Sequence, residues 1–176
     1  MKATSLLENQ HRKIEALLKK LETGVADHAA VLQELGNSLA SHMAIEQDIF
    51  YPAIKRLNDD LVNESYEEHA LAEVALKRLM ATDPEDDEFR ARAIALKDLL
   101  QHHVEEEEDE LFPAVHQAMD KEALEHLGET MQRRYDEVFD QGFDATVPKG
   151  WFKTSADLSK KAADKLGKKK PSQSAA

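Results

Sequence analysis

Apolar side chains recur at helical spacing along most of the chain, and no stretch alternates polar and apolar residues as a half-buried strand would. The pattern predicts four long helices, over about residues 5–23, 27–51, 60–80 and 83–113. A shorter amphipathic helix is expected from about Lys121 to Phe139, ahead of Gly142. Short loops favour antiparallel neighbours, so we expect an all-α protein, an up-down-up-down four-helix bundle with a short fifth helix.

The ends of these helices are marked by capping residues and prolines. Ser5 and Glu8 have the spacing of a capping box, which predicts that the first helix begins near Ser5. Asp83 followed by Pro84 is typical of an N-cap and a first helical residue, so the fourth helix should begin there. Two prolines, which lack an amide hydrogen, are expected to bend or end the second and fourth helices: Pro52 and Pro113.

The second and fourth predicted helices share a motif. SHMAIEQDIFYPAI, residues 41–54, aligns with HHVEEEEDELFPAV, residues 102–115. The alignment superposes His42 on His103 and Glu46 on Glu107. In each copy the His and the Glu are four residues apart, so they lie on one face of a helix, about one turn from each other.

The first and third predicted helices are related in the same way. HRKIEALLKKL, from His11, aligns with HALAEVALKRL, from His69, which also superposes Glu15 on Glu73. The chain is therefore an internal duplication of a helical hairpin with a period of about sixty residues. Because one hairpin could not bury its own apolar face, the two halves should form one bundle.

The predicted turns place the four motif His at similar heights in this bundle. Two residues of an antiparallel hairpin share a level when the turn lies midway between them, and the midpoints of successive His pairs fall close to the predicted turns. One His–Glu pair by itself would more often be an ordinary surface pair. Six such residues at matched levels instead favour a metal site, because metal sites are recognised by clusters of this kind.

Four imidazoles and two carboxylates exceed what one tetrahedral zinc uses, and they suit two ions bridged by carboxylates. The chain has no Cys, so thiolate ligands are excluded and the set favours iron, manganese or zinc. The predicted metal ligands are His11, His42, Glu46, His69, His103 and Glu107. Glu73 and Glu15 each follow a motif His by four residues and are weaker candidates for additional ligands, and a Tyr close to the centre could also bind.

Charge is distributed unevenly along the chain. The net charge is −12, but residues 146–176 contain eight Lys and two Asp and carry +6, which leaves −18 for the rest. So acidic a body argues against nucleic-acid binding, which needs a basic face. We assign residues 1–141 to the bundle and 142–176 to a largely irregular, flexible, Lys-rich C-terminal tail that could contact a protein partner.

No apolar run approaches the roughly 18 residues that span a bilayer. The N-terminal segment carries charges among its apolar positions, so it does not have the pattern of a secretory signal. We therefore expect no membrane span and a location in the cytoplasm of a bacterium.

The order H…HxxxE…H…HxxxE resembles that of the hemerythrin-like family, specifically its bacterial HHE cation-binding domains. The resemblance covers about residues 6–127 and includes the phrases IFYPAI and LFPAV that follow the two motifs. It implies a four-helix bundle around a non-haem di-iron centre, with two iron ions bridged by carboxylate and by an oxo or hydroxo group. The six predicted ligands would hold these ions, with zinc or manganese as substitutes, and the centre would react with O2 or related small molecules.

Two positions depart from the oxygen-carrying members of that family. Glu73 stands where the carriers have a second His on the third helix, and the last helix has His103-x-x-x-Glu107 in place of a His-x-x-x-x-Asp spacing. A more anionic site favours Fe(III) over Fe(II), so reversible O2 carriage is not expected.

The leading hypothesis is therefore a metal-binding protein that binds or senses O2, peroxide, nitric oxide or iron. The alternative is a di-iron enzyme that turns over peroxide or nitric oxide, with Glu73 or a nearby Tyr assisting. A metal-free interaction bundle is a third reading, which the ligand set opposes.

Overall fold

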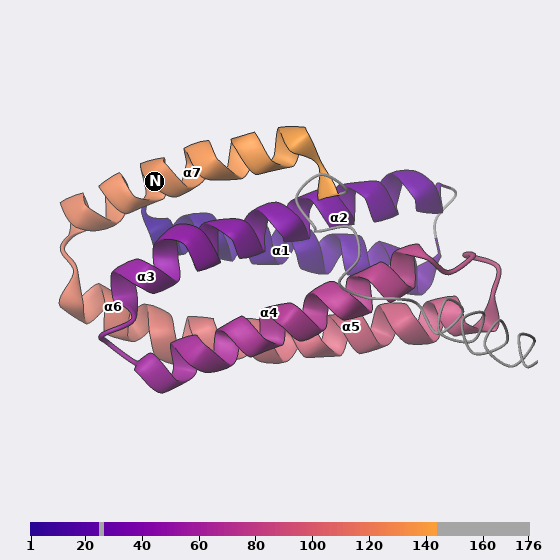
Figure 1. Ribbon diagram of the computed structural model, residues 1–176, viewed down its shortest axis with the longest axis horizontal. Coiled ribbons are helices and arrows are strands. Elements are labelled where there is room, and N and C mark those ends of the chain that lie inside the picture. Colours follow the sequence, from indigo (N-terminus) through magenta and orange to yellow (C-terminus); the bar gives the residue numbers. More distant parts are fainter. Residues whose placement is uncertain (25–26, 144–176) are drawn as a thin grey trace, which may run out of the picture.

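The structure is a computed structural model that describes residues 1–24 and 27–143. Four long antiparallel helices form the bundle, and a fifth lies against two of them (Figure 1). The bundle helices are α1 (Ala3–Thr23), α2 (His28–Ile45), α4 (Asp59–Met80) and α5 (Asp87–Glu106), and the outer helix is α7 (Lys121–Gln141). The described residues form no strand, which confirms the all-α prediction. At 21 residues, α7 is as long as α1 and not a short addition.

Each predicted ligand helix continues past its proline, and one π-helical turn lies just before that proline. The π segment η1 (Glu46–Phe50) joins α2 to α3 (Tyr51–Ile54), and η2 (Glu107–Leu111) joins α5 to α6 (Phe112–Ala118). A proline ring clashes with the carbonyl four residues earlier in an α-helix, and the wider π turn relieves that contact. The two prolines therefore change the helical register here and do not end the helices.

The hydrogen bonds around Pro52 fit this account. The Tyr51 amide donates to the Glu46 carbonyl, five residues earlier. The next carbonyl, of Gln47, would need the amide hydrogen that Pro52 lacks, and the Tyr66 hydroxyl donates to it instead at 3.1 Å. A side chain of α4 thus stabilises the irregular turn beside the first candidate carboxylate.

Two helix starts differ from the sequence prediction. Helix α1 begins at Ala3, ahead of Ser5, and Ala3 and Thr4 are fully buried, so packing of the first turn outweighs the capping-box signal. Helix α5 begins at Asp87, because the Asp83 carboxylate accepts from the Glu85 amide in a turn and does not cap a helix.

Apolar side chains form two buried clusters, one on each side of a polar layer. The first cluster includes Ile14, Leu39, Leu76 and Leu96, and the second includes Leu7, Phe50, Val62 and Leu111. On each of the four bundle helices, the motif His falls where one cluster gives way to the other. The four His therefore form a layer that the two apolar clusters shield from both ends of the bundle.

Helix α7 packs against α1, α2 and the π segment η1. Gly128 comes so close to the backbone of Met1 and Ala3 that any side chain at this position would collide with it. Arg134 of α7 also donates to Asp48 of η1 at 2.9 Å. Phe143 lies in the first apolar cluster, and its amide donates to the Asn37 side chain at 2.9 Å. Beyond Phe143 the predicted C-terminal tail falls outside the described residues.

Candidate metal centre

The polar layer contains six titratable side chains that the sequence singled out. At most 3% of the surface of each residue is exposed, and Glu46 and Glu107 are completely buried. They are His11 of α1, His42 of α2, Glu46 of η1, His69 of α4, His103 of α5 and Glu107 of η2. The tertiary structure thus brings together six residues that are spread over 97 positions of the chain.

Their Nε2 and carboxylate atoms converge on one point. One oxygen of Glu46 lies 3.3 Å from His42 Nε2 and 3.3 Å from His69 Nε2. One oxygen of Glu107 lies 3.3 Å from His11 Nε2 and 3.9 Å from His103 Nε2. The Nε2 atoms of His69 and His103 are 3.1 Å apart, and the rings of His11 and His42 pack edge to face at 4.8 Å. Each carboxylate therefore lies between imidazoles from opposite halves of the repeat.

Several of these atoms are buried without a hydrogen bond to any described residue: His11 Nε2, both oxygens of Glu46 and one oxygen of Glu107. A buried polar atom without a partner costs about 1–3 kcal/mol, and more when it is charged. Cations between the carboxylates and imidazoles would remove this penalty. His11, His42 and Glu46 offer ligand atoms within 4.8 Å of one another, as do Glu46, His69 and His103. The donor set therefore fits metal ions.

The outer nitrogen of each imidazole has a polar partner. The Nδ1 atoms of His11 and His103 lie 2.8 Å from carboxylate oxygens of Glu108 and Glu68 respectively. The Nδ1 atoms of His42 and His69 lie 2.9 Å and 3.1 Å from the side-chain amides of Gln10 and Gln47. Such partners fix the ring orientation and direct Nε2 toward a metal, as is usual for ligating His.

These outer partners follow the internal repeat, which sequence reasoning missed. Gln10 and Glu68 each precede the motif His of their helix by one residue, and Gln47 and Glu108 each follow a motif Glu by one. The repeat alignment therefore pairs them, and in each pair one half of the chain supplies an amide and the other a carboxylate. A residue adjacent to a motif His or Glu points in a different direction from it, toward a neighbouring helix. Whether that residue contacts an imidazole therefore depends on which helix packs there.

Tyr51 reaches the centre from the second apolar cluster. Its hydroxyl donates to Glu107 at 2.9 Å and lies 3.3 Å from His69 Nε2. Burial, together with Glu107 and Glu46, raises the pKa of Tyr51 well above its usual range, so the phenol keeps its proton. At the corresponding place of the other half, Phe112 stacks on His11 with ring centroids 6.1 Å apart. One half of the repeat therefore presents a hydroxyl and the other an apolar ring.

Two of the imidazoles, those of His42 and His69, are held in their neutral form. Burial lowers the pKa of His42 well below its usual value, and the nearby His11 adds to the effect. Burial, with His103 beside it, lowers the pKa of His69 to about 3. Burial opposes charge on His103 as well, but Glu107 and Glu68 outweigh it and raise the pKa of His103. Neutral imidazole is the form that binds metal, so His42 and His69 are prepared for it.

The two central carboxyls have opposite shifts. Burial and the proximity of Glu107 raise the pKa of Glu46 well above its usual value. Burial has the same tendency at Glu107, but His103 and His11 outweigh it and bring the pKa of Glu107 below its usual value. Like charges this close oppose double ionisation, which is why the pKa values of the two carboxyls move apart.

The two weaker candidates are not brought into this layer. The Glu15 side chain is 64% exposed and pairs with Arg12 at 3.5 Å, whereas Glu73 pairs with Lys77 at 2.6 Å on the same helix. His102 also lies outside, with its Nε2 3.4 Å from Glu106 and 3.8 Å from Glu68. Neighbouring positions of one helix thus separate into buried and surface groups.

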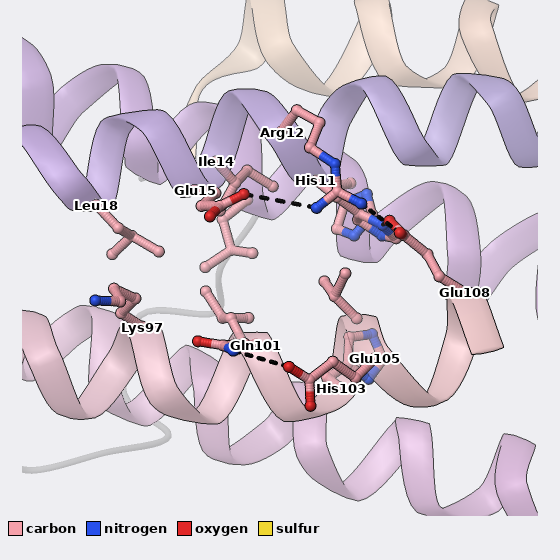
Figure 2. A pocket seen from close by; sticks show the side chains of 14 residues that line it. His11, Arg12, Ile14, Glu15, Leu18, Lys97, Gln101, His103, Glu105 and Glu108 are labelled. Carbon is pink, nitrogen blue, oxygen red and sulfur yellow. Dashed lines mark hydrogen bonds and ion pairs between the residues drawn. The ribbon is translucent and has the colours of Figure 1, made fainter. Parts of the chain in front are cut away.

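A cavity of about 190 Å³ opens beside the layer, between α1 and α5 (Figure 2). His11, His42 and His103 line its inner part, and apolar side chains of the first cluster line its walls. The candidate centre is therefore buried but has a route to the surface.

An antiparallel four-helix bundle with His and carboxylate ligands at its core defines a class of helical metal-binding proteins. The model of one such family, the hemerythrin HHE cation-binding domain, matches residues 2–115. The chain therefore belongs to the hemerythrin HHE cation-binding family, and it is a cation-binding protein of that type.

Two known proteins are similar to this chain. A solved structure of a hemerythrin HHE cation-binding domain-containing protein from Mycobacterium kansasii matches with a TM-score of 0.72 and 26% identity, covering 80% of this chain and 89% of that one. A curated protein of Nostoc sp. named DNA nickase is 25% identical over 129 residues, which are 71% of this chain and 36% of the relative. The chain thus spans about a third of the length of that curated relative. No helix in the described part of the chain is both long and apolar enough to cross a membrane.

Proposed function

We propose that the protein is a non-haem di-iron protein that binds or senses a small ligand, such as O2, peroxide or nitric oxide, or iron itself, in the bundle core. The observation that carries this proposal is a layer of buried ligand atoms contributed by four helices, several of which, in His11, Glu46 and Glu107, have no hydrogen bond. Iron is favoured among the candidate cations because imidazole and carboxylate together suit it, with zinc and manganese as substitutes.

In this proposal His11 and His42 would hold one ion, and His69 and His103 would hold the other. Glu46 and Glu107 would be shared between the two ions, because each carboxylate lies between a His of one pair and a His of the other. Bound iron would supply one-electron redox chemistry and open coordination positions for a small ligand. Two negative bridging groups would favour the ferric state, as the sequence already suggested.

Residues around the six candidate ligands support this site. The outer partners of the four imidazoles hold each Nε2 toward the centre, and the Glu68 carboxylate also raises the pKa of His103. The Tyr51 hydroxyl holds Glu107 in place. The two apolar clusters exclude bulk water from both ends of the layer, which strengthens the electrostatic interactions within it.

Turnover of peroxide or nitric oxide is a second candidate, favoured by one observation. The Tyr51 phenol is buried, keeps its proton and touches Glu107, so it could deliver a proton to a reacting ligand. Replacing Tyr51 by Phe would then reduce turnover while iron content is unchanged. In a binding or sensing protein, the same substitution would leave ligand binding within a few fold.

The DNA nickase activity of the Nostoc relative is not part of this proposal. The chain spans about a third of that protein, and the net charge of −18 outside residues 146–176 argues against DNA binding, which needs a basic face.

Metal content, measured with the visible absorption spectrum of protein purified in air, tests the proposal. Two irons per chain with charge-transfer absorption in the near ultraviolet are expected. Reduction followed by exposure to O2 or nitric oxide then separates stable binding from turnover, because only turnover consumes ligand beyond the iron present. Protein that neither contains iron nor takes it up would refute the di-iron assignment. A cytoplasmic location and a protein partner for the tail remain predictions.

A further inference from the structure

The cavity between α1 and α5 combines an inner part at the candidate centre with apolar walls. Its wall residues are Ile14, Leu18, Leu39, Leu100 and Val104, of which all but Val104 are buried. An apolar cavity of roughly 150 Å³ can stay dry and bind benzene or xenon. At about 190 Å³, this cavity is large enough for a diatomic molecule.

The two cationic side chains at the cavity are each paired with carboxylates. Arg12 interacts with both Glu15 and Glu108, and Lys97 interacts with Glu22 at 2.9 Å. The exposed Glu105 carboxylate, which also lines the cavity, accepts a hydrogen bond from Gln101 at 2.8 Å. An anion that approached would find both cations already engaged, and it would lose hydration on entering the apolar walls. An uncharged molecule would meet neither obstacle, so the mouth discriminates against anions.

The route is also one-sided with respect to the repeat. Gln101 and Val104 line the cavity on α5, where Gln101 is exposed and Val104 is partly buried. Their counterparts on α2 are Ala40 and Met43, and both are buried. Ile14, Leu18, Leu39 and Leu100 of the cavity walls belong to the first apolar cluster, whereas Tyr51 belongs to the second. The cavity and Tyr51 therefore approach the polar layer from opposite ends.

We propose that the α1–α5 cavity is the entrance and holding site through which an uncharged, apolar diatomic gas reaches the centre. The gas would arrive at the side of the centre that His11, His42 and His103 line. This inference rests on the proposed function and narrows its ligand class: a gas such as O2 or nitric oxide in preference to an anion. Arg12 and Glu108 form the mouth, and Glu108 also touches His11, so the entrance and a candidate ligand share one carboxylate.

Xenon tests the cavity without reference to iron. Crystals of the full chain under xenon pressure should show xenon between α1 and α5. Val104→Trp, which fills the cavity, should remove that xenon. Leu99→Trp is the matched control, because Leu99 is also partly buried on α5 but does not line the cavity. Absence of xenon from the wild-type cavity would overturn the proposal.

Stopped-flow mixing of the reduced, iron-loaded protein with O2 or nitric oxide tests the route. Val104→Trp should react about tenfold more slowly, which corresponds to roughly 1.4 kcal/mol in the barrier, and Leu99→Trp should react like the wild type. An unchanged rate in a Val104→Trp protein that excludes xenon would also overturn the proposal. If Val104→Trp loses iron, Gln101→Trp, which covers the mouth from an exposed position, replaces it with the same expectation.

The two proposals fail in different ways. If the wild-type protein does not bind iron, both the proposed function and the proposed entrance are refuted, whatever the xenon experiment shows. If iron-loaded protein with the cavity filled reacts at the wild-type rate, only the proposed entrance is refuted.

Discussion

Glu68 offers a sharp test of the candidate centre, because it touches His103 without belonging to the six predicted ligands. One of its oxygens lies 2.8 Å from His103 Nδ1, and the residue is only 8% exposed. A hydrogen bond to a charged group contributes about 1.5–3 kcal/mol. Glu68→Ala should therefore weaken metal binding by about 10–100-fold, which is the range expected for losing such a partner of a ligating His.

The internal repeat suggests a graded second substitution. At the corresponding position of the other half, Gln10 makes the same kind of contact to His42 at 2.9 Å. Glu68→Gln keeps an acceptor for His103 and removes only the charge, so it should weaken binding by less than about tenfold. The order of affinities should be wild type, then Gln, then Ala.

Competition with a chelator of known affinity measures these differences, on protein loaded with iron and, separately, with zinc. Glu67→Ala provides the control, because it removes a neighbouring but exposed carboxylate from the same helix. Helical content by circular dichroism establishes that each variant is folded. If Glu68→Ala and Glu67→Ala bind metal equally well, the contact to His103 does not orient a metal ligand and the reasoning is wrong.

Three further predictions concern the ligands, the pH dependence and the π turn. Glu46→Ala should lose most bound metal, whereas Glu73→Ala should retain it, because Glu73 pairs with a Lys outside the layer; equal metal content in the two variants would contradict the assignment. Metal affinity should fall as pH decreases from about 7 to about 4, because burial raises the pKa of Glu46 and a metal must displace the proton held there. In the metal-free protein, the raised pKa of Glu46 should lower the free energy of unfolding as pH rises above the usual pKa of Glu, because the unfolded chain then releases a proton that the folded protein retains. Chelator competition across this pH range tests the predicted trend in metal affinity, and denaturant titration tests the predicted trend in stability. Tyr66→Phe should reduce the free energy of unfolding by about 1–3 kcal/mol, because the Gln47 carbonyl loses its donor; no change in urea unfolding would indicate that water replaces the hydroxyl.

The sequence predicted the four bundle helices and the six residues of the central layer, for one physical reason. Helical spacing determines which residues share a face, and the turns determine which residues share a height. His11 and His103 are far apart in the chain, yet those two rules were enough to place both in one layer. The lack of Cys and the pairing of His with Glu then limited the metals that the layer would suit.

The tertiary structure decided which surrounding residues support the site, because support depends on contacts between helices. Glu68 and His102 both lie next to a motif His, but one is buried against His103 and the other is mostly exposed. Glu15 shares a helix with His11 at helical spacing, yet its side chain turns outward to Arg12. Periodicity does not separate such cases, since the direction of a side chain at the edge of a face depends on the neighbouring helix.

Local signals at the helix ends were also decided by tertiary contacts. The capping-box signal at Ser5 was overruled by burial of Ala3. The Asp83 carboxylate stabilises a turn, so the helix predicted to begin at Asp83 begins at Asp87. The π turn at Glu46 combines a proline with a partner on α4 for the carbonyl that the proline leaves free, and that partner is a tertiary contact. Sequence thus determined what the layer contains, while packing between helices determined how it is oriented, supported and reached.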